Sequence, residues 1–400
     1  MKKIMQINIT CGRGSTGKLA QSLYHAVQQE GWQARFAYSA YTPTLNNAFP
    51  IETKWQNYLR RGLNRYFGKK QSHSTPGTKR LIRYIKKEQP DLIHLHNVQQ
   101  NSVNYHKLFA FLKKSKIPVV YTLHDCWAFT GGCFHFTERN CSGFMTGCRD
   151  CPLSAHPDDV TLSAESAYAC KKILIGENER IYPVCVSDWL RDSAASSYMK
   201  YMQHKPITVY NGIDTQLFCP KPTNIRKKYK IPEDRFMILG VASFWTEEKG
   251  LSIFLDLGKR LPEDAVIVLV GRQLEAMQET NIICIPQTEN QEELAQIYST
   301  ADVYVNGSLE ETFGMTTAEA LACGTPAIVF DSTACPEVVD EKTGIVAQPG
   351  QKLLPIILAV KEKGKEQYIS HCVKRVKACF SEERMMEEYL ALYRSILDGK

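Results

Sequence analysis

The chain has 400 residues, of which 44% are apolar and 23% are charged, a composition typical of globular proteins. This length favours two or three domains, each large enough for a hydrophobic core of its own. Because the sequence contains no run of about 18 apolar residues and the apolar segment at its N-terminus is too short for a signal peptide, we expect a cytoplasmic protein.

Positive charge is concentrated in the first half of the chain. Residues 1–205 hold 28 Lys and Arg against 14 Asp and Glu, whereas the remaining residues hold 21 against 28. The segment 54–87 contains eleven of these cations and no acid, interleaved with aromatic and apolar residues such as Trp55 and Tyr58. This pattern favours an amphipathic helix on an anionic membrane surface. Nucleic acid is the competing partner, and a solvated helix is the third interpretation.

The N-terminal segment predicts a buried strand over 3–9, a glycine-rich turn and a helix over 19–29. The turn reads Cys11-Gly12-Arg13-Gly14-Ser15-Thr16-Gly17-Lys18. A dinucleotide-binding motif would need an acidic residue at the end of the second strand, and a P-loop would need Ser or Thr where Leu19 stands. What remains is the property that both motifs share, a turn at a helix N-terminus that faces an anion or the substrate cleft.

Two further predicted strands end in polar residues. The strand over 91–97 ends in His96 and Asn97, and the strand over 118–123 leads into His124 and Asp125. Ligands gather at the carboxyl ends of strands in open parallel sheets, so these four residues are expected to line one cleft. A histidine at a strand end can equally be a hydrogen-bonded structural residue, and the strand pattern leaves both interpretations open.

Fourteen cysteines in a reducing compartment are expected to be thiols rather than disulfides. The loop 126–155 is rich in them, with Cys133, Cys141, Cys148 and Cys151. Four thiols so close in sequence could form a structural zinc site, in which four protein ligands leave no open position for catalysis. Their spacing is not that of a standard zinc finger. Unpaired structural cysteines, disulfides and an iron–sulfur cluster therefore remain alternatives.

Residues 308–326 contain the most informative motif of the chain. They read as a loop that leads into a helix, between an apolar strand over 302–305 and another over 327–330, which predicts a βαβ unit. A helix that begins near Thr316 or Thr317 would direct its N–H groups and the positive end of its dipole at the preceding turn, which suits a phosphate. Gly314 would allow a ligand to approach the backbone closely. Spacing alone leaves an ordinary surface helix with two solvated acids as the alternative.

Glu311 and Glu319 lie on either side of the Phe-Gly turn and are followed by Ala-Leu-Ala-Cys-Gly-Thr-Pro. This pattern closely resembles the donor-site signature of the family 4 retaining glycosyltransferases. Those enzymes have the α/β GT-B fold, with two facing Rossmann-like domains, parallel sheets and an interdomain cleft. The resemblance implies that Glu311 contacts the donor sugar and that Glu319 holds the nucleotide ribose. It also implies that the sugar and its diphosphate are held at Phe313, Gly314, Met315 and Thr316.

Two motifs in the first half carry the same resemblance. The sequence from Tyr121 to Cys133 is similar to the family's histidine loop, which implies that His124 contacts the donor sugar beside the bond that breaks. The predicted acceptor-side residues are His96, Asn97, Asp125 and Trp127. The Gly-Ser-Thr-Gly-Lys turn resembles the bacterial exopolysaccharide, or colanic-acid-type, subgroup. By this resemblance, the residues expected to face the donor diphosphate are Gly14, Ser15, Thr16 and Gly17.

The cations that hold the leaving diphosphate match the family only in part. Lys249-Gly250 fits the family pattern, but Phe244 stands where the common pattern has an Arg. This departure resembles the exopolysaccharide subgroup and leaves the second cation unassigned, with Arg272 and Arg13 as candidates. A solvated surface lysine is the alternative for Lys249.

The resemblance also predicts the organisation of the chain. An N-terminal acceptor-binding domain is expected over 1–205 and a C-terminal donor-binding domain over 206–380. A final helix over 381–400 is expected to cross back onto the first domain. The predicted activity is retaining transfer of a sugar from a nucleotide-diphosphate sugar to a saccharide or polyprenyl-diphosphate-linked acceptor in cell-surface polysaccharide biosynthesis. We expect it at the inner face of the membrane and without a catalytic metal, since the sequence has no Asp-x-Asp motif.

Two other functions compete with this prediction. One is a P-loop-type NTPase or kinase built on residues 12–18, against which Leu19 argues because it cannot hold magnesium. The other is a zinc-stabilised nucleic-acid-binding protein that uses the basic first half, which would leave the glutamate motif of residues 311–319 unexplained.

Overall fold

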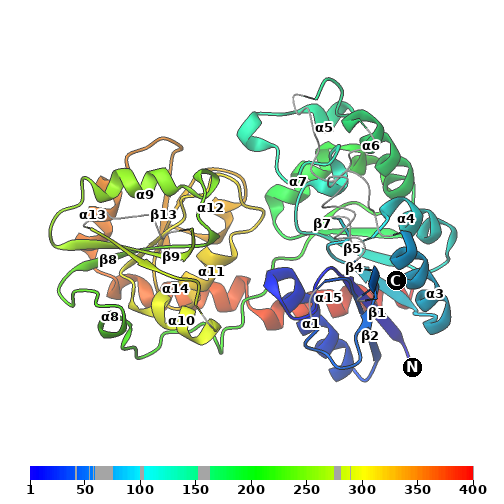
Figure 1. Cartoon of the computed structure of the whole chain (residues 1–400), viewed down its shortest axis with the longest axis horizontal. Coiled ribbons are helices and arrows are strands. Elements are labelled where there is room, and N and C mark those ends of the chain that lie inside the picture. The colour runs from blue at the N-terminus through cyan, green and yellow to red at the C-terminus, as the bar shows by residue number, and fades with distance from the viewer. Residues whose placement is uncertain are drawn as a thin grey trace. The chain divides into compact units, whose positions relative to one another are not determined.

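The computed structural model describes residues 1–40, 43–53, 55–56, 58, 75–99, 103–151, 163–273, 281–288 and 290–399. The chain divides into two compact units (Figure 1). Unit 1 comprises Met1–Val209 together with Met386–Lys400, and unit 2 comprises Tyr210–Met385.

Unit 1 contains a parallel sheet with the strand order β3-β2-β1-β4-β5-β6-β7. Its strands are β1 (Lys3–Asn8), β2 (Gln33–Tyr38), β3 (Phe49–Pro50), β4 (Leu92–Leu95), β5 (Val119–Leu123), β6 (Ile181–Cys185) and β7 (Ile207–Thr208). Every residue of β4 and β5 is buried, as expected for central strands of a parallel sheet covered by helices. The ends of these two strands therefore place their polar residues at one edge of the sheet.

Helices connect the strands of unit 1. The described ones are α1 (Gly14–Gln29), α3 (Thr75–Glu88), α4 (Tyr105–Lys114), α5 (Gly143–Thr146), α6 (Ala164–Lys171) and α7 (Asp188–Ser196). Short 3-10 helices are η2 (Trp127–Phe129), η3 (Thr137–Arg139) and η5 (Tyr198–Tyr201), and η4 (Lys172–Gly176) is a π-helix. The Ser187 hydroxyl accepts the Leu190 N–H and caps the N-terminus of α7.

Unit 2 contains a second parallel sheet, with the strand order β10-β9-β8-β11-β12-β13. Its strands are β8 (Phe236–Phe244), β9 (Ala265–Arg272), β10 (Ile282–Ile285), β11 (Val303–Val305), β12 (Ala327–Phe330) and β13 (Gly344–Ala347). Its helices are α8 (Ile225–Lys228), η6 (Glu247–Lys249), α9 (Leu251–Gly258), α10 (Gln291–Thr300), α11 (Met315–Ala322), α12 (Cys335–Val338), α13 (Leu353–Lys363) and α14 (Glu366–Cys379). Within this unit, α9 and α13 lie on one face of the sheet and α10 and α14 on the other (Figure 1). The prediction of two Rossmann-like α/β domains with parallel sheets is confirmed.

The last helix, α15 (Glu382–Leu397), contributes its later residues to unit 1. The Tyr393 hydroxyl lies 3.2 Å from the Gln6 amide nitrogen, and the Tyr389 hydroxyl lies 2.7 Å from that of Thr122. Near the end of the helix, Arg394 forms an ion pair of 2.6 Å with Glu30. These contacts fasten α15 to β1, β5 and α1.

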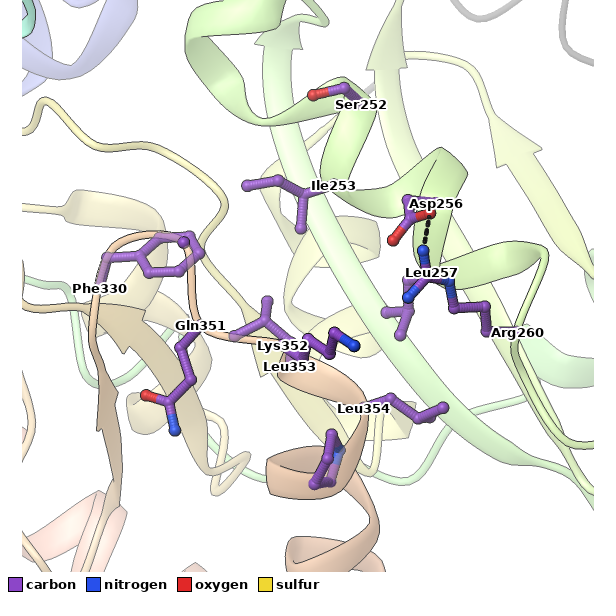
Figure 2. Close-up of a pocket in the computed structure, with 12 residues that line it drawn as sticks. Ser252, Ile253, Asp256, Leu257, Arg260, Phe330, Gln351, Lys352, Leu353 and Leu354 are labelled. Atoms are coloured by element: carbon purple, nitrogen blue, oxygen red, sulfur yellow. Dashed lines mark hydrogen bonds and ion pairs between the residues drawn. The ribbon is translucent and has the colours of Figure 1, made fainter.

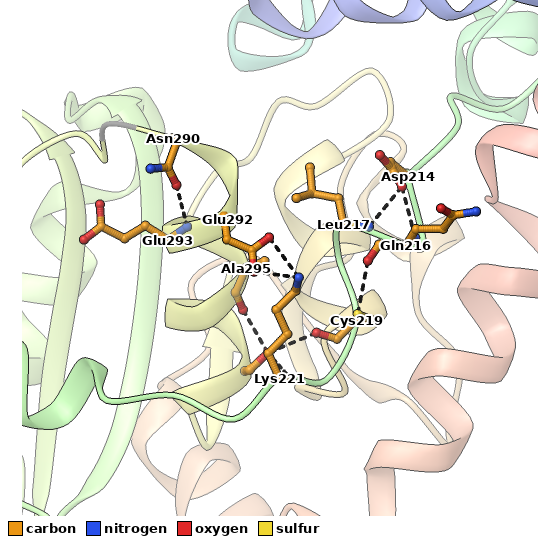
Figure 3. Close-up of polar contacts among 10 residues, drawn as sticks. Asp214, Gln216, Leu217, Cys219, Lys221, Asn290, Glu292, Glu293 and Ala295 are labelled. Atoms are coloured by element: carbon orange, nitrogen blue, oxygen red, sulfur yellow. Dashed lines mark hydrogen bonds and ion pairs between the residues drawn. The ribbon is translucent and has the colours of Figure 1, made fainter.

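The two segments that connect the units run side by side. Ile213 forms a parallel bridge with Ser381, and a Cβ on Gly212 would lie 2.5 Å from the Cα of Glu382, so only glycine fits there. The chain then turns at Asp214, whose carboxylate accepts two backbone N–H groups, and reaches Lys221, which pairs with Glu292 of α10 at 2.8 Å (Figure 3). The start of unit 2 is therefore anchored to its own helix layer.

Only part of the predicted membrane-facing segment, residues 54–87, belongs to the described residues. Residues 54, 57 and 59–74 lie outside the described part of the chain, and the later cations of the segment lie on α3. Trp55 and Tyr58 are described and are 74% and 72% exposed. No helix among the described residues is long and apolar enough to cross a membrane.

A close backbone approach in unit 2 gives a test of the fold. Gly250 has φ +77°, and a Cβ there would lie 2.4 Å from the carbonyl oxygen of Gly307. Gly350 has the similar φ of +81°, but a Cβ there would meet no other atom within 4 Å. We expect Gly350→Ala to cost about 1–2 kcal/mol from the left-handed conformation alone. Gly250→Ala is expected to cost about 1–3 kcal/mol more, because the backbone must move apart.

The thermal unfolding midpoints of the two variants measure this difference. Since both glycines lie in unit 2, the same transition reports on both. Equal losses of stability would contradict the contact between residues 250 and 307.

Candidate active site

The predicted donor residues of unit 2 lie at the carboxyl ends of neighbouring strands. Lys249 follows β8, and Glu311 follows β11; these strands are paired in the sheet. The Lys249 Nζ lies 2.7 Å from the Glu311 Oε1, with 40% and 22% of the two side chains exposed. The structure therefore brings together two residues that are 62 positions apart, and it leaves both accessible to a ligand.

A loop after β12 holds the backbone of Glu311. The Glu311 N–H donates to the Thr333 hydroxyl at 3.0 Å, and the Glu311 carbonyl accepts the Ala334 N–H at 3.2 Å. Thr333 has φ 50°, which is unusual for a β-branched residue and is typical of backbone held under strain near functional sites. Thr333 lies outside every motif that the sequence offered. Its only signal was its position at the carboxyl end of a strand next to β11.

The first turn of α11 is positioned by side chains of β11 and the loop after it. The Tyr304 hydroxyl donates to the Thr316 hydroxyl at 2.8 Å, and the Asn306 amide donates to the Thr317 hydroxyl at 3.2 Å. Gly314 precedes the helix with φ +98°. The first N–H groups of an α-helix have no acceptor within the helix, so this turn favours an anion. The helix begins at Met315, one or two residues before the predicted start.

Two residues of the motif have structural partners. Phe313 is buried, and its ring lies 5.5 Å from that of Phe380 and 6.0 Å from that of Tyr210, so only its backbone remains available to a ligand. The carboxylate of Glu319 accepts a hydrogen bond of 3.1 Å from the Tyr298 hydroxyl. The assignment of Glu319 to the nucleotide ribose stays a prediction.

Arg272 lies directly opposite the residue that replaces the family Arg. Phe244 pairs with Arg272 across β8 and β9, and the guanidinium carbon lies 5.4 Å from the centre of the Phe244 ring. Phe244 is half exposed. Arg272 therefore has its charge held over an aromatic face at the carboxyl end of β9. Arg13, the other candidate, belongs to unit 1, where it precedes α1.

The glycine-rich motif of unit 1 overlaps the start of α1, which begins at Gly14, five residues before the predicted helix start. Gly14 has φ +65° and is exposed together with Ser15, while Thr16 is partly buried. Gly17 is buried, and a Cβ there would lie 2.4 Å from the Thr10 hydroxyl, so this position requires glycine. The turn thus presents a helix N-terminus, as the sequence analysis expected. Contact of these residues with a diphosphate stays a prediction.

The polar residues at the ends of β4 and β5 are brought together. The His96 Nδ1 lies 3.2 Å from the His124 Nε2. The Asn97 N–H donates to the Asn8 side chain at 3.1 Å. Asp125 accepts the Trp127 N–H at 2.9 Å and the Gln99 amide at 2.5 Å, so its carboxylate shapes the loop.

A buried hydrogen-bond network continues from His96 to α15. The His96 Nε2 lies 2.9 Å from the Gln6 Oε1, and the Gln6 Nε2 lies 3.2 Å from the Tyr393 hydroxyl. His94, which the sequence analysis did not single out, contacts Tyr393 at 2.5 Å and the Thr122 hydroxyl at 2.7 Å. Burial lowers the pKa of His94 and His96 well below 6.5 and that of His124 to about 4, so all three rings are neutral at pH 7.

Trp127 lies in the core of the loop that follows His124. Its indole is 2% exposed, with the Lys171 Nζ 3.9 Å from the ring centre and the Tyr105 ring packed edge-on at 5.0 Å. The same lysine, itself buried, donates to the carbonyls of Trp127 and Thr130 at 2.8 and 3.1 Å. Its placement gives Trp127 a packing role here, and the acceptor-side assignment stays a prediction.

The cysteine-rich loop is held by aromatic packing. Among the residues that the structure describes, no group of three or more His, Cys, Asp or Glu side chains is placed to hold a metal ion. The predicted zinc site of Cys133, Cys141, Cys148 and Cys151 is therefore not supported. Burial raises the pKa of the Cys133 and Cys148 thiols to about 11. The aromatic cluster that holds the loop has ring centres 4.3–6.4 Å apart among Phe129, Phe136, Phe144 and Trp189.

A cavity of about 490 Å³ lies elsewhere in unit 2, between α9, the end of β12 and the start of α13 (Figure 2). Ile253, Leu257 and Leu353 supply apolar walls, and an ion pair of 2.8 Å between Arg260 and Asp256 lies at its rim. None of the predicted donor residues lines it. The cavity is therefore separate from the site around Lys249 and Glu311.

Comparison with known families identifies the chain. The model described as Glycosyltransferase Family 4 matches residues 16–217, about half of the chain, and the model described as Glycosyl transferases group 1 matches residues 222–368. The chain belongs to glycosyltransferase family 4. Over 98% of its length, this glycosyltransferase is 23% identical to the whole of WcaC of Escherichia coli (strain K12), whose name assigns it to colanic acid biosynthesis as a glycosyl transferase.

Solved structures confirm the GT-B fold of this family 4 glycosyltransferase. The sucrose-phosphate synthase of Thermosynechococcus elongatus matches with a TM-score of 0.71 and 16% identity, covering 100% of both chains. HepE of Anabaena, solved in complex with UDP-glucose, matches with a TM-score of 0.66 and 15% identity, covering 99% of this chain and 100% of its own.

The buried histidines make a prediction for the pH dependence of stability. Their pKa is lowered in the folded state, so below pH 6.5 the unfolded chain binds more protons than the folded one. Stability should therefore be lost as the pH falls from about 6.5 towards the lowered values. Each buried histidine contributes a loss of about 1.4 kcal/mol between pH 7.5 and pH 5.5.

Unfolding midpoints at the two pH values check this in the wild type and in two variants. His94→Asn should show a smaller loss between pH 7.5 and pH 5.5 than the wild type, because one buried histidine is gone. His25→Asn, at an exposed position on α1, serves as the control and should match the wild type. A His94→Asn variant with the pH dependence of the wild type would contradict the burial of a neutral His94.

Proposed function

We propose that the chain is a retaining glycosyltransferase that moves a sugar from a nucleotide-diphosphate sugar to a saccharide or polyprenyl-diphosphate-linked saccharide in cell-surface polysaccharide biosynthesis. The observation that carries the proposal is the ion pair of Lys249 and Glu311 in the unit that also holds the first turn of α11. Family membership supports glycosyl transfer, full-length similarity to WcaC supports a polysaccharide pathway, and the structural likeness to HepE supports a nucleotide-sugar donor.

The proposed domain roles follow the expected boundaries. Residues 206–380 bind the donor, residues 1–205 bind the acceptor, and the helix over 381–400 returns to the first domain. His124 is assigned to the donor sugar through its sequence motif. Residues 14–17 are assigned to the diphosphate in the same way. His96, Asn97 and Asp125 are assigned to the acceptor side.

Lys249 and the first turn of α11 would together neutralise the departing diphosphate. The ammonium supplies a full charge, and the helix N-terminus supplies the partial positive charge of its N–H groups. In the structure Lys249 is engaged with Glu311, so a bound diphosphate would compete for the ammonium. We infer that donor binding transfers Lys249 to phosphate and releases the Glu311 carboxylate to accept hydrogen bonds from the sugar.

A displacement on one face of the sugar ring retains the anomeric configuration without a covalent intermediate between the sugar and the enzyme. The bond between the anomeric carbon and the phosphate oxygen breaks, and the acceptor oxygen forms its bond on the same face. The proton of the acceptor hydroxyl passes to the departing phosphate oxygen. Glu311 and His124 would hold the sugar and stabilise the positive charge that develops on it.

A panel of nucleotide sugars tests this function. The donor that raises the unfolding midpoint of the protein should also be the one whose sugar is transferred, since a ligand that binds only the folded state stabilises it. The anomeric proton coupling of the product should show the same configuration as the donor. An inverted product would contradict the retaining mechanism, and a panel without transfer or stabilisation would contradict the function.

Variants of the ion pair extend this test. Glu311→Ala and Lys249→Ala should each abolish transfer and still fold, because a partly exposed ion pair contributes only about 0–1 kcal/mol to stability. Glu292→Ala and Lys221→Ala remove the comparable pair of unit 2 shown in Figure 3 and should keep activity. Near-normal turnover of either site variant would overturn the role of that residue.

The basic segment 54–87 leads us to propose peripheral binding to an anionic membrane surface, where a polyprenyl-linked acceptor would lie. Trp55 and Tyr58 are both mostly exposed, with ring centres 6.4 Å apart. Such a pair would enter the lipid interface, and the cations of the segment would meet anionic headgroups.

Co-sedimentation with vesicles measures this binding. The wild type should sediment with vesicles that contain phosphatidylglycerol and not with neutral phosphatidylcholine vesicles, and salt should weaken the binding. The double variant Trp55→Ser, Tyr58→Ser should bind less. Tyr201→Ser, at a 75% exposed position of the same unit, is the matched control. Indifference to lipid charge would count against a membrane role.

A further inference from the structure

Two loops of unit 2 are joined at the carboxyl edge of its sheet. The loop after β11 carries Glu311, and the loop after β12 carries Thr333; the two strands are paired. Both backbone polar groups of Glu311 are bound by the second loop. Its N–H donates to the Thr333 hydroxyl at 3.0 Å, and its carbonyl accepts the Ala334 N–H at 3.2 Å. The Ser332 hydroxyl also donates to the carbonyl of Leu309 at 2.6 Å. The second loop therefore positions the backbone from which the Glu311 side chain extends.

The backbone conformation of Thr333 is one that glycine would adopt more readily. Its φ of 50° lies in the left-handed region, where the Cβ of an L-residue crowds the backbone and a β-branched residue is rare. Glycine has no Cβ and avoids this crowding, but it has no side chain that could form a hydrogen bond. What threonine supplies at this turn, and glycine would lack, is the hydroxyl that accepts the Glu311 N–H.

The contact with Thr333 becomes more important when the donor binds. In the structure the Glu311 carboxylate is paired with Lys249 at 2.7 Å. The proposed function transfers this lysine to the diphosphate, which removes the pairing. The hydrogen bonds to the backbone of Glu311 do not involve Lys249, so they remain in place. They would then keep the carboxylate within reach of the sugar.

We propose that Thr333 is a positioning residue, whose hydroxyl holds Glu311 in place for the donor sugar. The proposal rests on the proposed function, in which Glu311 contacts that sugar. Because Thr333 acts only through Glu311, loss of its hydroxyl should weaken the binding of the sugar and spare that of the nucleoside diphosphate. A threonine that only stabilised the loop would instead lower the stability of the protein and leave the contribution of the sugar unchanged.

Three variants separate these roles. Thr333→Val removes the hydroxyl and keeps a β-branched side chain, so the backbone is as crowded as before. Thr333→Ser keeps the hydroxyl and loses the methyl group. Thr343→Val is the matched control in the same unit, because the buried Thr343 hydroxyl also accepts a backbone N–H, that of Asp340 at 2.9 Å.

Calorimetric titration of the full-length protein measures the contribution of the sugar. The probes are UDP-glucose, UDP-galactose, UDP-N-acetylglucosamine and GDP-mannose, together with UDP and GDP. The nucleotide sugar that binds most tightly is compared with its own diphosphate, and the ratio of the two affinities is the measured quantity. In Thr333→Val this ratio should fall by about fivefold, as expected for one hydrogen bond, while the affinity for the diphosphate stays unchanged. Thr333→Ser and Thr343→Val should keep the ratio of the wild type.

Hydrogen exchange of the Glu311 amide tests the contact without any ligand. This amide should exchange faster in Thr333→Val than in the wild type or in Thr333→Ser, because its acceptor is lost. Thr333→Ala removes the same hydroxyl if Thr333→Val does not fold. An unchanged exchange rate, an unchanged affinity ratio, or an equal fall of the ratio in Thr343→Val would overturn the proposal. Absence of binding of every nucleotide sugar by the wild type would instead count against the proposed function.

Discussion

The Lys249–Glu311 ion pair is the interaction on which the account of unit 2 depends. With both side chains partly exposed, it contributes little to stability, and its proposed role is to bind the donor. Its geometry nevertheless comes from the fold. Gly250 allows the lysine turn to approach Gly307 closely, and Thr333 holds the backbone of Glu311 from the next strand. Parallel strands that end at one edge bring these three turns together.

The predicted site residues of unit 1 include buried side chains, whereas the ion pair of unit 2 is partly exposed. His94 lies within β4, and His96 and His124 follow the ends of β4 and β5. His94 and His96 are both buried. Burying polar groups without partners is costly, yet both ring nitrogens of His94 and His96 lie at hydrogen-bond distance from a partner. The network makes α15 part of the environment of His124, because Tyr393 reaches it through Gln6 and His96.

The sequence predicted the elements whose signal is local. The alternation of apolar segments and turns predicted the βαβ unit around residues 308–326, and its helix begins within two residues of the expected start. The parallel sheets and the convergence of His96 and His124 also followed from strand-end reasoning. The resemblance to the family placed Lys249 and Glu311 in one site, and the structure shows the two side chains in contact.

Other features depend on contacts between distant positions, which spacing does not reveal. Gln6 and Tyr393 are 387 residues apart, and Thr333 lies 22 residues from the glutamate that it holds. The zinc expectation came only from four cysteines that lie close in sequence in a chain expected to be in a reducing compartment. The loop is instead held by an aromatic cluster and by the buried Lys171, and neither had a signal in the motif. Trp127 resembled a ligand-facing residue in its motif but fills the core beside that lysine.

We propose above all that Lys249, Glu311 and the first turn of α11 form the binding site for the diphosphate of a nucleotide. Calorimetric titration of the full-length protein with UDP, GDP and ADP tests it most directly. The account predicts that at least one of them binds, that Lys249→Ala weakens this binding by tenfold or more, and that Lys221→Ala leaves it unchanged. Absence of binding by all three nucleotides, or equal affinities of the wild type and Lys249→Ala, would contradict it.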